Sequence, residues 1–197
     1  MAKNRSLYKY QPSFVLGFHG TEASVVNKVV SRSSKHLTAS EGKYEWLGHG
    51  IYFWENDPQR AIEWATDGNS KKKIKEPSTV GAIIDLGLCL DLTTRSGLDE
   101  VKLAHEMLCD FYAQSCKELP QNNGGKYLLR RELDCQVIQA LHIYRENNKL
   151  PKYDSVRSPF IEDEPLYLGA GFNSKNHIQI AIRSISCIKV YFHPIEA

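Results

Sequence analysis

The mainly apolar run at residues 15–19, with the sequence VLGFH, predicts that the first regular element of the chain is a strand. Leu16 and Phe18 share one face of that strand. Gly20 and Thr21 should end it, with Thr21 capping a helix. The apolar residues of this helix recur at helical spacing and are Ala23, Val26, Val29 and Val30.

A second strand and a second helix are predicted after a loop at residues 31–47. Residues 48–54, with the sequence GHGIYFW, end in an apolar run, and their two glycines permit close backbone approach to another group. A helix should begin next, because Asp57 can cap it and Pro58 suits the first helical position. Residues 67–78 are rich in lysine and loop-forming residues and should protrude.

The second half of the chain predicts helices enclosed by strands. Residues 80–92 predict an apolar strand interrupted at Gly87, and helical periodicity follows over residues 98–112 and 130–144. Residues 151–174 contain several prolines and glycines and are expected to form one long loop.

The last part of the chain predicts two strands. Isoleucines alternate with other residues over 178–183, and Ile188, Val190 and Phe192 alternate with Cys187, Lys189 and Tyr191. Strands early and late, with helices between them, favour an α+β fold with a split, two-sheet core. No repeat or domain boundary is evident, so we expect a single domain over residues 1–197.

Composition narrows the class of protein. The 197 residues are 42% hydrophobic with a net charge of +2, which is typical of a folded domain without a strong overall field. Five cysteines without CxxC spacing, and no apolar leader, favour reduced thiols in the cytoplasm. The histidines lack metal-ligand spacing, so no metal is expected. No apolar run reaches the roughly 20 residues of a membrane-spanning helix.

Three short segments carry candidate chemistry: Gly17-Phe18-His19-Gly20-Thr21, Gly48-His49-Gly50-Ile51-Tyr52-Phe53 and His177-Ile178-Gln179-Ile180. Each has an ordinary explanation when taken alone. His19 could simply end a strand, Tyr52 could belong to the core, and Gln179 could lie on the polar face of a half-buried strand.

Together, and in this order, the segments resemble the diphtheria-toxin and PARP-like branch of the ADP-ribosyltransferase superfamily, the H-Y-E type. That branch has a histidine in an H-G-[ST] strand end and a tyrosine in a G-x-G-I-Y-F segment, with an alanine about nine residues on, matched here by Ala61. Its third residue is a glutamate in a late strand, where this chain has Gln179. Residues 46–55 and 177–180 also resemble a group of small bacterial proteins. The resemblance implies an ADP-ribosyltransferase-like split β-sandwich with flanking helices.

The resemblance also implies NAD as the substrate and assigns roles to individual residues. The backbone of Gly20 would hold the nicotinamide carboxamide, and His19 would bond an adenosine ribose hydroxyl, with Thr21 donating nearby. Tyr52 would stack on the nicotinamide, and Trp64 is the nearest candidate for the second aromatic wall. Gly50 would permit close approach of the cofactor.

The implied reaction is loss of nicotinamide through a ribosyl cation, followed by capture by a nucleophile. Gln179 keeps the hydrogen bond of the family's glutamate but not its charge, which at about 4 Å and an effective dielectric of 20 is worth roughly 4 kcal/mol. Three outcomes follow. Gln179 positions the ribose for a pre-activated nucleophile, an acid from Glu162-Asp163-Glu164 swings in, or NAD binds without turnover. We favour the first.

The acceptor stays open between protein and nucleic acid. Lys71 to Lys75 and Arg130-Arg131, with Tyr127 nearby, could follow a phosphate backbone, or they could be a solvated charge run. Similarity to small bacterial transferases implies a toxin or anti-phage effector with a neutralising antitoxin partner.

Three other functions compete with this interpretation. One is a non-catalytic NAD or ADP-ribose binding module, and another is an NAD glycohydrolase. A cysteine hydrolase is disfavoured, because Cys135 and His142 would lie two helical turns, roughly 10 Å, apart.

Overall fold

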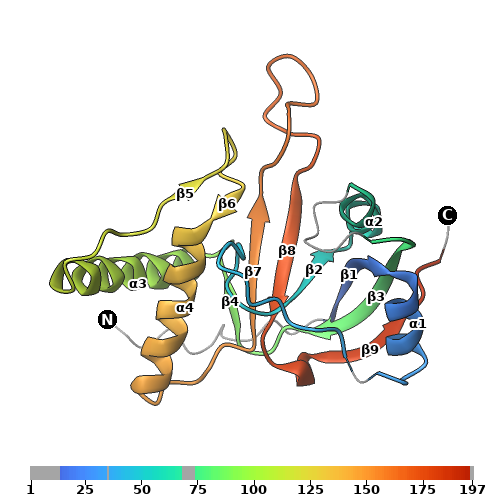
Figure 1. Cartoon of the computed structure of the whole chain (residues 1–197), viewed down its shortest axis with the longest axis horizontal. Helices are drawn as coiled ribbons and strands as arrows, with labels where there is room; N and C mark the ends of the chain where they lie inside the picture. The colour runs from blue at the N-terminus through green and yellow to red at the C-terminus, as the bar shows by residue number, and fades with distance from the viewer. Residues whose placement is uncertain (1–13, 35, 68–73, 196–197) are drawn as a thin grey trace.

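A seven-stranded mixed sheet in the order β4-β7-β8-β2-β1-β3-β9 forms the centre of the computed structural model, which describes residues 14–34, 36–67 and 74–195 (Figure 1). The strands of this sheet are β1 (Phe14–Glu22), β2 (Ile51–Glu55), β3 (Pro77–Asp85), β4 (Cys89–Asp91), β7 (Ser155–Phe160), β8 (His177–Ile182) and β9 (Ile188–Phe192). β5 (Asn122–Asn123) and β6 (Arg130–Arg131) form a separate pair. The helices are α1 (Ala23–Val30), α2 (Pro58–Thr66), α3 (Arg95–Gln114) and α4 (Glu132–Asn147), with a short 3-10 turn at Ile185–Cys187. The α+β prediction is confirmed at this level.

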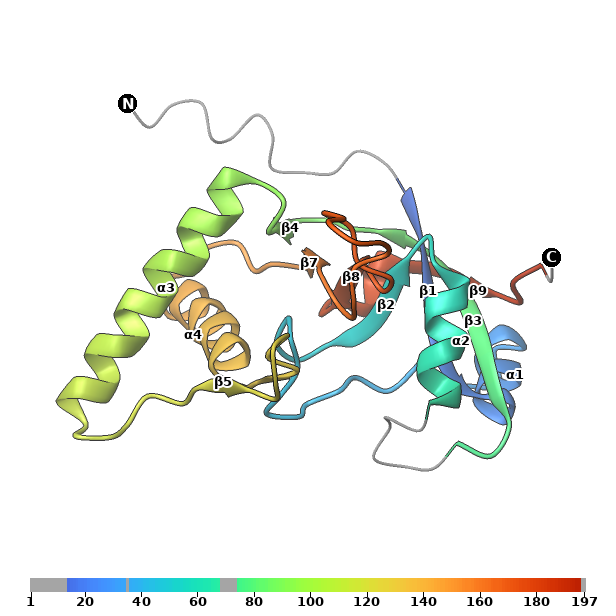
Figure 2. The ribbon, with the colours of Figure 1, turned by 90° about the horizontal axis from the view of Figure 1, so that it is seen from above.

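The sheet has a narrow join between β1 and β2. These strands pair only at Gly17 with Glu55 and at Phe18 with Trp54, whereas β1 pairs with β3 along its whole length. Figure 2 shows β2 leaving β1 toward the side that carries α3 and α4. The join therefore divides the sheet into β4-β7-β8-β2 and β1-β3-β9.

Two large buried clusters pack against the sheet, and the first contains residues from both of its parts. Val26 of α1 packs with Phe53 and Ile84 in one buried cluster, and Leu141 of α4 packs with Val156 in another. A third, small cluster joins Phe18, Trp54 and Ala61, where α2 crosses β1 and β2. The three helical regions thus cover different parts of one sheet (Figure 2).

The first strand is longer than predicted, and Thr21 does not cap the helix after it. Pairing with β3 continues to Glu22, opposite Pro77, so Gly20 and Thr21 lie within β1. Glu22 occupies the N-cap position but makes no side-chain cap bond. Its carboxylate accepts instead from the backbone N–H groups of Lys75 and Glu76, both at 2.9 Å. These long-range bonds, rather than a local turn, determine where β1 ends.

The predicted loop at 151–174 contains the strand β7, so that prediction is wrong over Ser155–Phe160. The strand lies between β4 and β8 although half of its residues, Ser155, Arg157 and Ser158, are polar. Arg157 makes this possible, because its guanidinium donates to Glu55 at 2.6 and 3.0 Å and to Asp91 at 3.2 Å. Pro159 is tolerated because β4 pairs no further than Arg157, so the missing N–H breaks no ladder bond.

Strand β9 does not keep the predicted alternation. Ile188 and Tyr191 are both buried, whereas Lys189 and Val190 are exposed. The register with β3 shifts between Ile83 and Ile84, which is where a β-bulge changes the face that later residues occupy. The bulge therefore overrides the simple period-two pattern.

Two local predictions are confirmed. The Asp57 carboxylate accepts from the Arg60 N–H at 2.9 Å, with Pro58 as the first residue of α2. Gly87 has φ +58° and separates β3 from β4. Both rest on chemistry within a few residues of chain.

Candidate functional site

His19, Tyr52 and Gln179 line one cleft of about 580 Å³. Strand register explains how residues so distant in sequence meet there. Tyr52 lies opposite Ala181 and Trp54 lies opposite Gln179, so Tyr52, Trp54 and Gln179 face the same side of the sheet. The cleft opens where β1 and β2 part.

His19 is fixed by the backbone of the neighbouring strand. Its Nδ1 lies 2.7 Å from the carbonyl oxygen of Tyr52, and since a carbonyl only accepts, Nδ1 carries the proton. Burial lowers the pKa of His19 below its ordinary value of 6.5, outweighing the opposing effect of that hydrogen bond. The ring is therefore neutral near pH 7, and its Nε2 is an acceptor suited to a hydroxyl group.

The same hydrogen bond explains why the sheet divides at this point. The Asn56 N–H donates to the Leu16 carbonyl at 2.9 Å, so alternate residues of β1, including Phe18 and Gly20, direct their backbone groups toward β2. In a continuous ladder the Tyr52 carbonyl would accept from Gly20, but it accepts from His19 instead. The backbone N–H and C=O of Gly20 therefore lie beyond the last β1–β2 pair, next to His19, although Gly20 itself is not among the residues that line the cleft.

Gly20 is also required for the packing of α2. A Cβ atom at this position would lie 1.9 Å from the Ala61 carbonyl oxygen and 3.1 Å from the Ala65 Cβ. No side chain fits unless the helix backbone moves. The glycine therefore serves helix packing as well as any contact with a ligand.

A Gly20→Ala variant should be destabilised by about 2 kcal/mol, the usual cost of overpacking a close contact. Chemical denaturation followed by circular dichroism measures this. Gly171, where a Cβ would meet nothing within 4 Å, provides the matched control in Gly171→Ala. Equal stability of the two variants would contradict the proposed contact between β1 and α2.

Tyr52 presents a ring that is held at its far end. Its hydroxyl donates to the Gly48 carbonyl at 2.7 Å and accepts from the Leu47 N–H at 2.8 Å. Burial raises the pKa of Tyr52 well above its ordinary value, so the hydroxyl stays protonated near neutral pH. Tyr52 is thus built to offer a flat surface rather than an acid or base.

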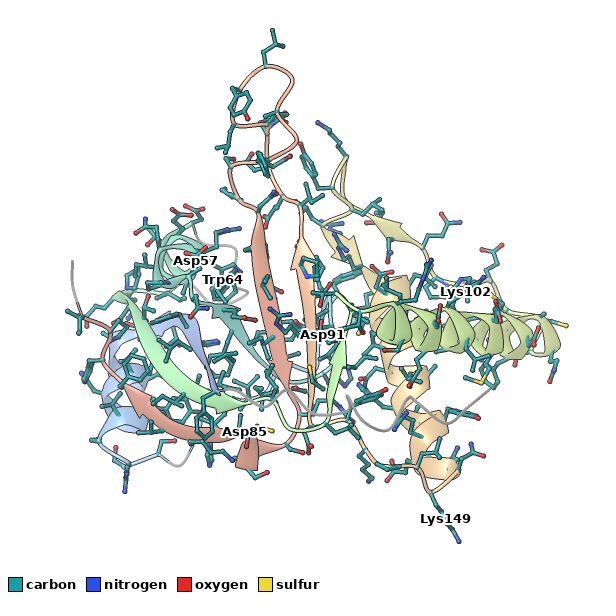
Figure 3. All side chains as sticks on the ribbon, turned by 180° about the vertical axis from the view of Figure 1, so that it is seen from behind. Asp57, Trp64, Asp85, Asp91, Lys102 and Lys149 are labelled. Atoms are coloured by element: carbon teal, nitrogen blue, oxygen red, sulfur yellow. The ribbon has the colours of Figure 1, made fainter. Side chains whose placement is uncertain are left out.

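The other predicted ligand-binding residues differ in their placement. Trp64, labelled on α2 in Figure 3, is one of the residues that line the cleft. Its ring centroid lies 5.9 Å from that of Trp54. Gly50 also lines the cleft, but its N–H and C=O are both bonded to Ser40, so they are already engaged. Thr21 does not line the cleft, since its side chain lies on β1 beyond His19.

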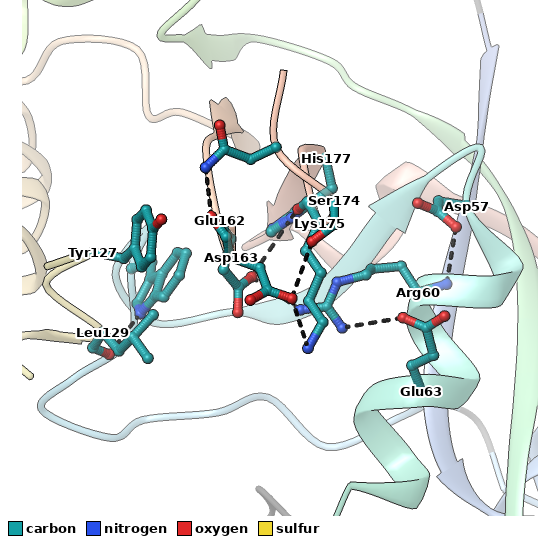
Figure 4. Close-up of polar contacts among 12 residues, drawn as sticks. Asp57, Arg60, Glu63, Tyr127, Leu129, Glu162, Asp163, Ser174, Lys175 and His177 are labelled. Atoms are coloured by element: carbon teal, nitrogen blue, oxygen red, sulfur yellow. Dashed lines mark hydrogen bonds and ion pairs between the residues drawn. The ribbon is translucent and has the colours of Figure 1, made fainter. Parts of the chain in front are cut away.

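An ion pair that the sequence motifs did not predict lies at one end of the cleft. Arg60 and Glu162 both line it, and their side chains are joined at 2.9 Å (Figure 4). The sequence marked Glu162 only as one of three neighbouring acids. Asp163 and Glu164 are more exposed and do not line the cleft.

The proposed phosphate-binding surface is only partly described. Lys71, Lys72 and Lys73 lie outside the described residues. Arg130 lines the cleft, whereas the Arg131 guanidinium lies 4.2 Å from the centre of the Trp46 ring. Arg131 is therefore engaged in packing.

A second hollow of about 350 Å³ lies between α3, α4 and the sheet, and it shares Trp46 with the cleft. Its lining is mainly apolar and includes none of the residues predicted to bind NAD, although Arg131 of the predicted phosphate-binding surface belongs to it. Within the described ranges, no three His, Cys, Asp or Glu side chains gather in a way that could hold a metal ion. The cleft beside β1 and β2 is thus the better candidate for the site.

Comparisons with protein-family models, curated proteins and solved structures found no match for this chain. In the part of the chain that the structure describes, none of the helices has the length and apolar character needed to cross a membrane.

Proposed function

We propose that this protein is an NAD-dependent ADP-ribosyltransferase that transfers ADP-ribose to a macromolecular acceptor. The observation that carries the proposal is that His19, Tyr52 and Gln179, from three distant segments, line one cleft. These are the three positions on which the resemblance to the H-Y-E type of transferase rests. The cleft volume of about 580 Å³ is within the range of cofactor sites.

The contacts of these residues suit the parts of NAD. Nε2 of His19 would accept from a ribose hydroxyl, and the backbone groups of Gly20 would pair with the carboxamide of nicotinamide. The Tyr52 ring would stack on nicotinamide, worth about 0.5–1.5 kcal/mol beyond burial, with Trp64 as the opposite wall.

The reaction would proceed by loss of nicotinamide. The bond between its ring nitrogen and ribose C1′ breaks, and the electron pair leaves with nicotinamide, which becomes neutral. The Gln179 amide would hold a ribose hydroxyl while cationic charge develops on the ribose. An acceptor nucleophile bonds to C1′ in the same step, as the bond to nicotinamide breaks.

The narrow join between β1 and β2 supports assigning this sheet to the split β-sandwich of that superfamily. The proposed acceptor is either a protein or a nucleic acid. Arg130 at the cleft would favour an acceptor that carries phosphate groups. Similarity to small bacterial transferases adds a toxin or anti-phage role and a neutralising partner protein.

The unchanged chain should release nicotinamide from NAD, and Gln179→Ala should reduce the rate about 100-fold because the ribose is no longer held. Chromatographic measurement of nicotinamide, with radiolabel from the adenosine part followed onto macromolecules, tests this. The exposed Gln114 at the end of α3 provides a control in Gln114→Ala, which should not change the rate.

The same assay separates the alternatives. Heat of NAD binding without nicotinamide release in any acceptor mixture would indicate a binding module. Release of nicotinamide and free ADP-ribose, with no labelled macromolecule, would indicate a glycohydrolase. If the protein gives no heat of NAD binding and releases no nicotinamide, the assignment of NAD to this cleft is overturned.

A further inference from the structure

We propose that Glu162 is the base that takes the proton from the acceptor nucleophile. This inference rests on the proposed function and deepens it, because it assigns the acceptor side of the cleft. It also names the acceptor chemistry: an O–H or N–H group that loses a proton as it bonds to ribose C1′.

The register of β7 and β8 positions Glu162 relative to Gln179. Ser158 pairs with Gln179 and Phe160 pairs with His177. The Lys175 N–H donates to the Glu162 carbonyl at 3.2 Å, which continues this register one step further. Since alternate residues share a face, Glu162 lies on the same side as Gln179.

The two ends of the cleft follow from this register. His19 approaches β2 at Tyr52, which is the level of Ala181 on β8. Gln179 comes next along the sheet, and Glu162 lies on its far side from His19. If His19 holds the adenosine ribose and Gln179 the nicotinamide ribose, Glu162 is on the side from which an acceptor must enter.

Glu162 and Gln179 line the same cleft. Glu162 follows Ser158, the partner of Gln179, by four positions, which corresponds to roughly 13 Å between the two Cα atoms in extended chain. Phe160 and His177 lie between them on the same face, and both are buried. A ribose held by Gln179 and a hydroxyl of the acceptor would therefore lie above these two side chains.

Glu162 is held in a way that leaves one oxygen for the acceptor. Its Oε2 accepts from Arg60 at 2.9 Å, and its side chain is only 19% exposed (Figure 4). His177 does not compete, because its Nδ1 is bonded to the Lys175 carbonyl at 2.7 Å. Among the described residues, Oε1 takes no hydrogen bond. A fixed carboxylate with a free oxygen is a suitable proton acceptor.

The step is balanced with water or an acceptor hydroxyl as the nucleophile. The oxygen lone pair forms the bond to C1′ while the bond from C1′ to nicotinamide breaks. Nicotinamide leaves as a neutral molecule, and the proton of the attacking oxygen moves to Glu162. No oxidant or reductant is needed.

Glu162→Gln should slow nicotinamide release in water about 100-fold. This is the lower end of the usual effect of a general base, because the bond from C1′ to nicotinamide is largely broken before the nucleophile has bonded. Azide has no proton to lose, so sodium azide at constant ionic strength should restore release by about ten-fold or more and form azido-ADP-ribose. Mass spectrometry identifies that adduct. Glu162→Ala provides a second variant, in which the vacated space admits azide directly.

The matched control is Asp163→Asn. It removes one negative charge from the adjacent residue, and asparagine tolerates the positive φ of +67° there. This variant should release nicotinamide at the rate of the unchanged chain and should gain nothing from azide.

Each result decides the matter. An unchanged rate in both Glu162 variants, or a fall that azide does not reverse in either, would overturn the role of Glu162 and leave the transferase proposal standing. Absence of nicotinamide release by the unchanged chain with every acceptor, including azide, would overturn both.

Discussion

A Gln179→Glu variant should release nicotinamide from NAD about 100- to 1000-fold faster than the unchanged chain. The substitution alters one side-chain group and adds a negative charge beside the ribosyl cation. At about 4 Å and an effective dielectric of 20 that charge is worth roughly 4 kcal/mol, and about 1.4 kcal/mol corresponds to a tenfold rate. The upper value assumes that the whole interaction is gained in the transition state.

Stopped and continuous assays of nicotinamide under saturating NAD would measure this gain. Gln114→Glu adds the same charge at an exposed position on α3, outside the cleft, and should leave the rate unchanged. A Gln179→Glu variant that binds NAD but is no faster would mean that Gln179 does not face the reacting carbon. The resemblance to the H-Y-E type would then fail at its third residue.

The parts of the fold that the sequence predicted correctly depend on local chemistry. β8 was expected from its isoleucine spacing, and α2 was expected from Asp57 and Pro58 at its start. In both cases the signal lies within about one element's length of chain. These local signals predict the structure correctly because no contact with distant residues overrides them.

The missed elements depend on partners that are distant in sequence. Half of the residues of β7 are polar, and the strand lies within the sheet because the Arg157 guanidinium donates hydrogen bonds to Glu55 and Asp91 on other strands. The end of β1 is set by backbone groups near residue 75 that bond to Glu22. The pattern of hydrophobic and polar residues predicts neither the contacts of Arg157 nor those of Glu22.

The candidate site likewise contains some residues that the sequence predicted and others that it could not predict. The resemblance of three segments, taken together and in order, to a known superfamily predicted that His19, Tyr52 and Gln179 would meet, and all three line one cleft. The sequence could not predict which of three acids enters the cleft, because Arg60, which holds Glu162, lies 102 residues away. Pairing across β7 and β8 is the information that was missing.

The protein should lose about 2 kcal/mol of folding free energy between pH 7 and pH 5 through His142 alone. Burial, followed by the positive charges of Arg183 and Arg145, lowers the pKa of His142 from 6.5 to about 3. Because the unfolded chain binds this proton more tightly, stability is complete above pH 6.5 and decreases as the pH falls toward 3. Among the residues that the structure describes, neither ring nitrogen has a hydrogen-bond partner that would offset this loss.

Replacing the buried ring isolates this contribution. His142→Phe keeps the aromatic packing against Tyr153, whose ring centre is 6.4 Å away, and should reduce the loss of stability between pH 7 and pH 5 by about 2 kcal/mol. Urea denaturation at several pH values measures the slope, with His193→Gln near the C-terminal end of the chain as the control that should leave it unchanged. An equal slope in the His142 and His193 variants would show that His142 is protonated in the folded protein. The buried His142 ring, which lies beside Tyr153, would then have to carry a charge, which its burial opposes.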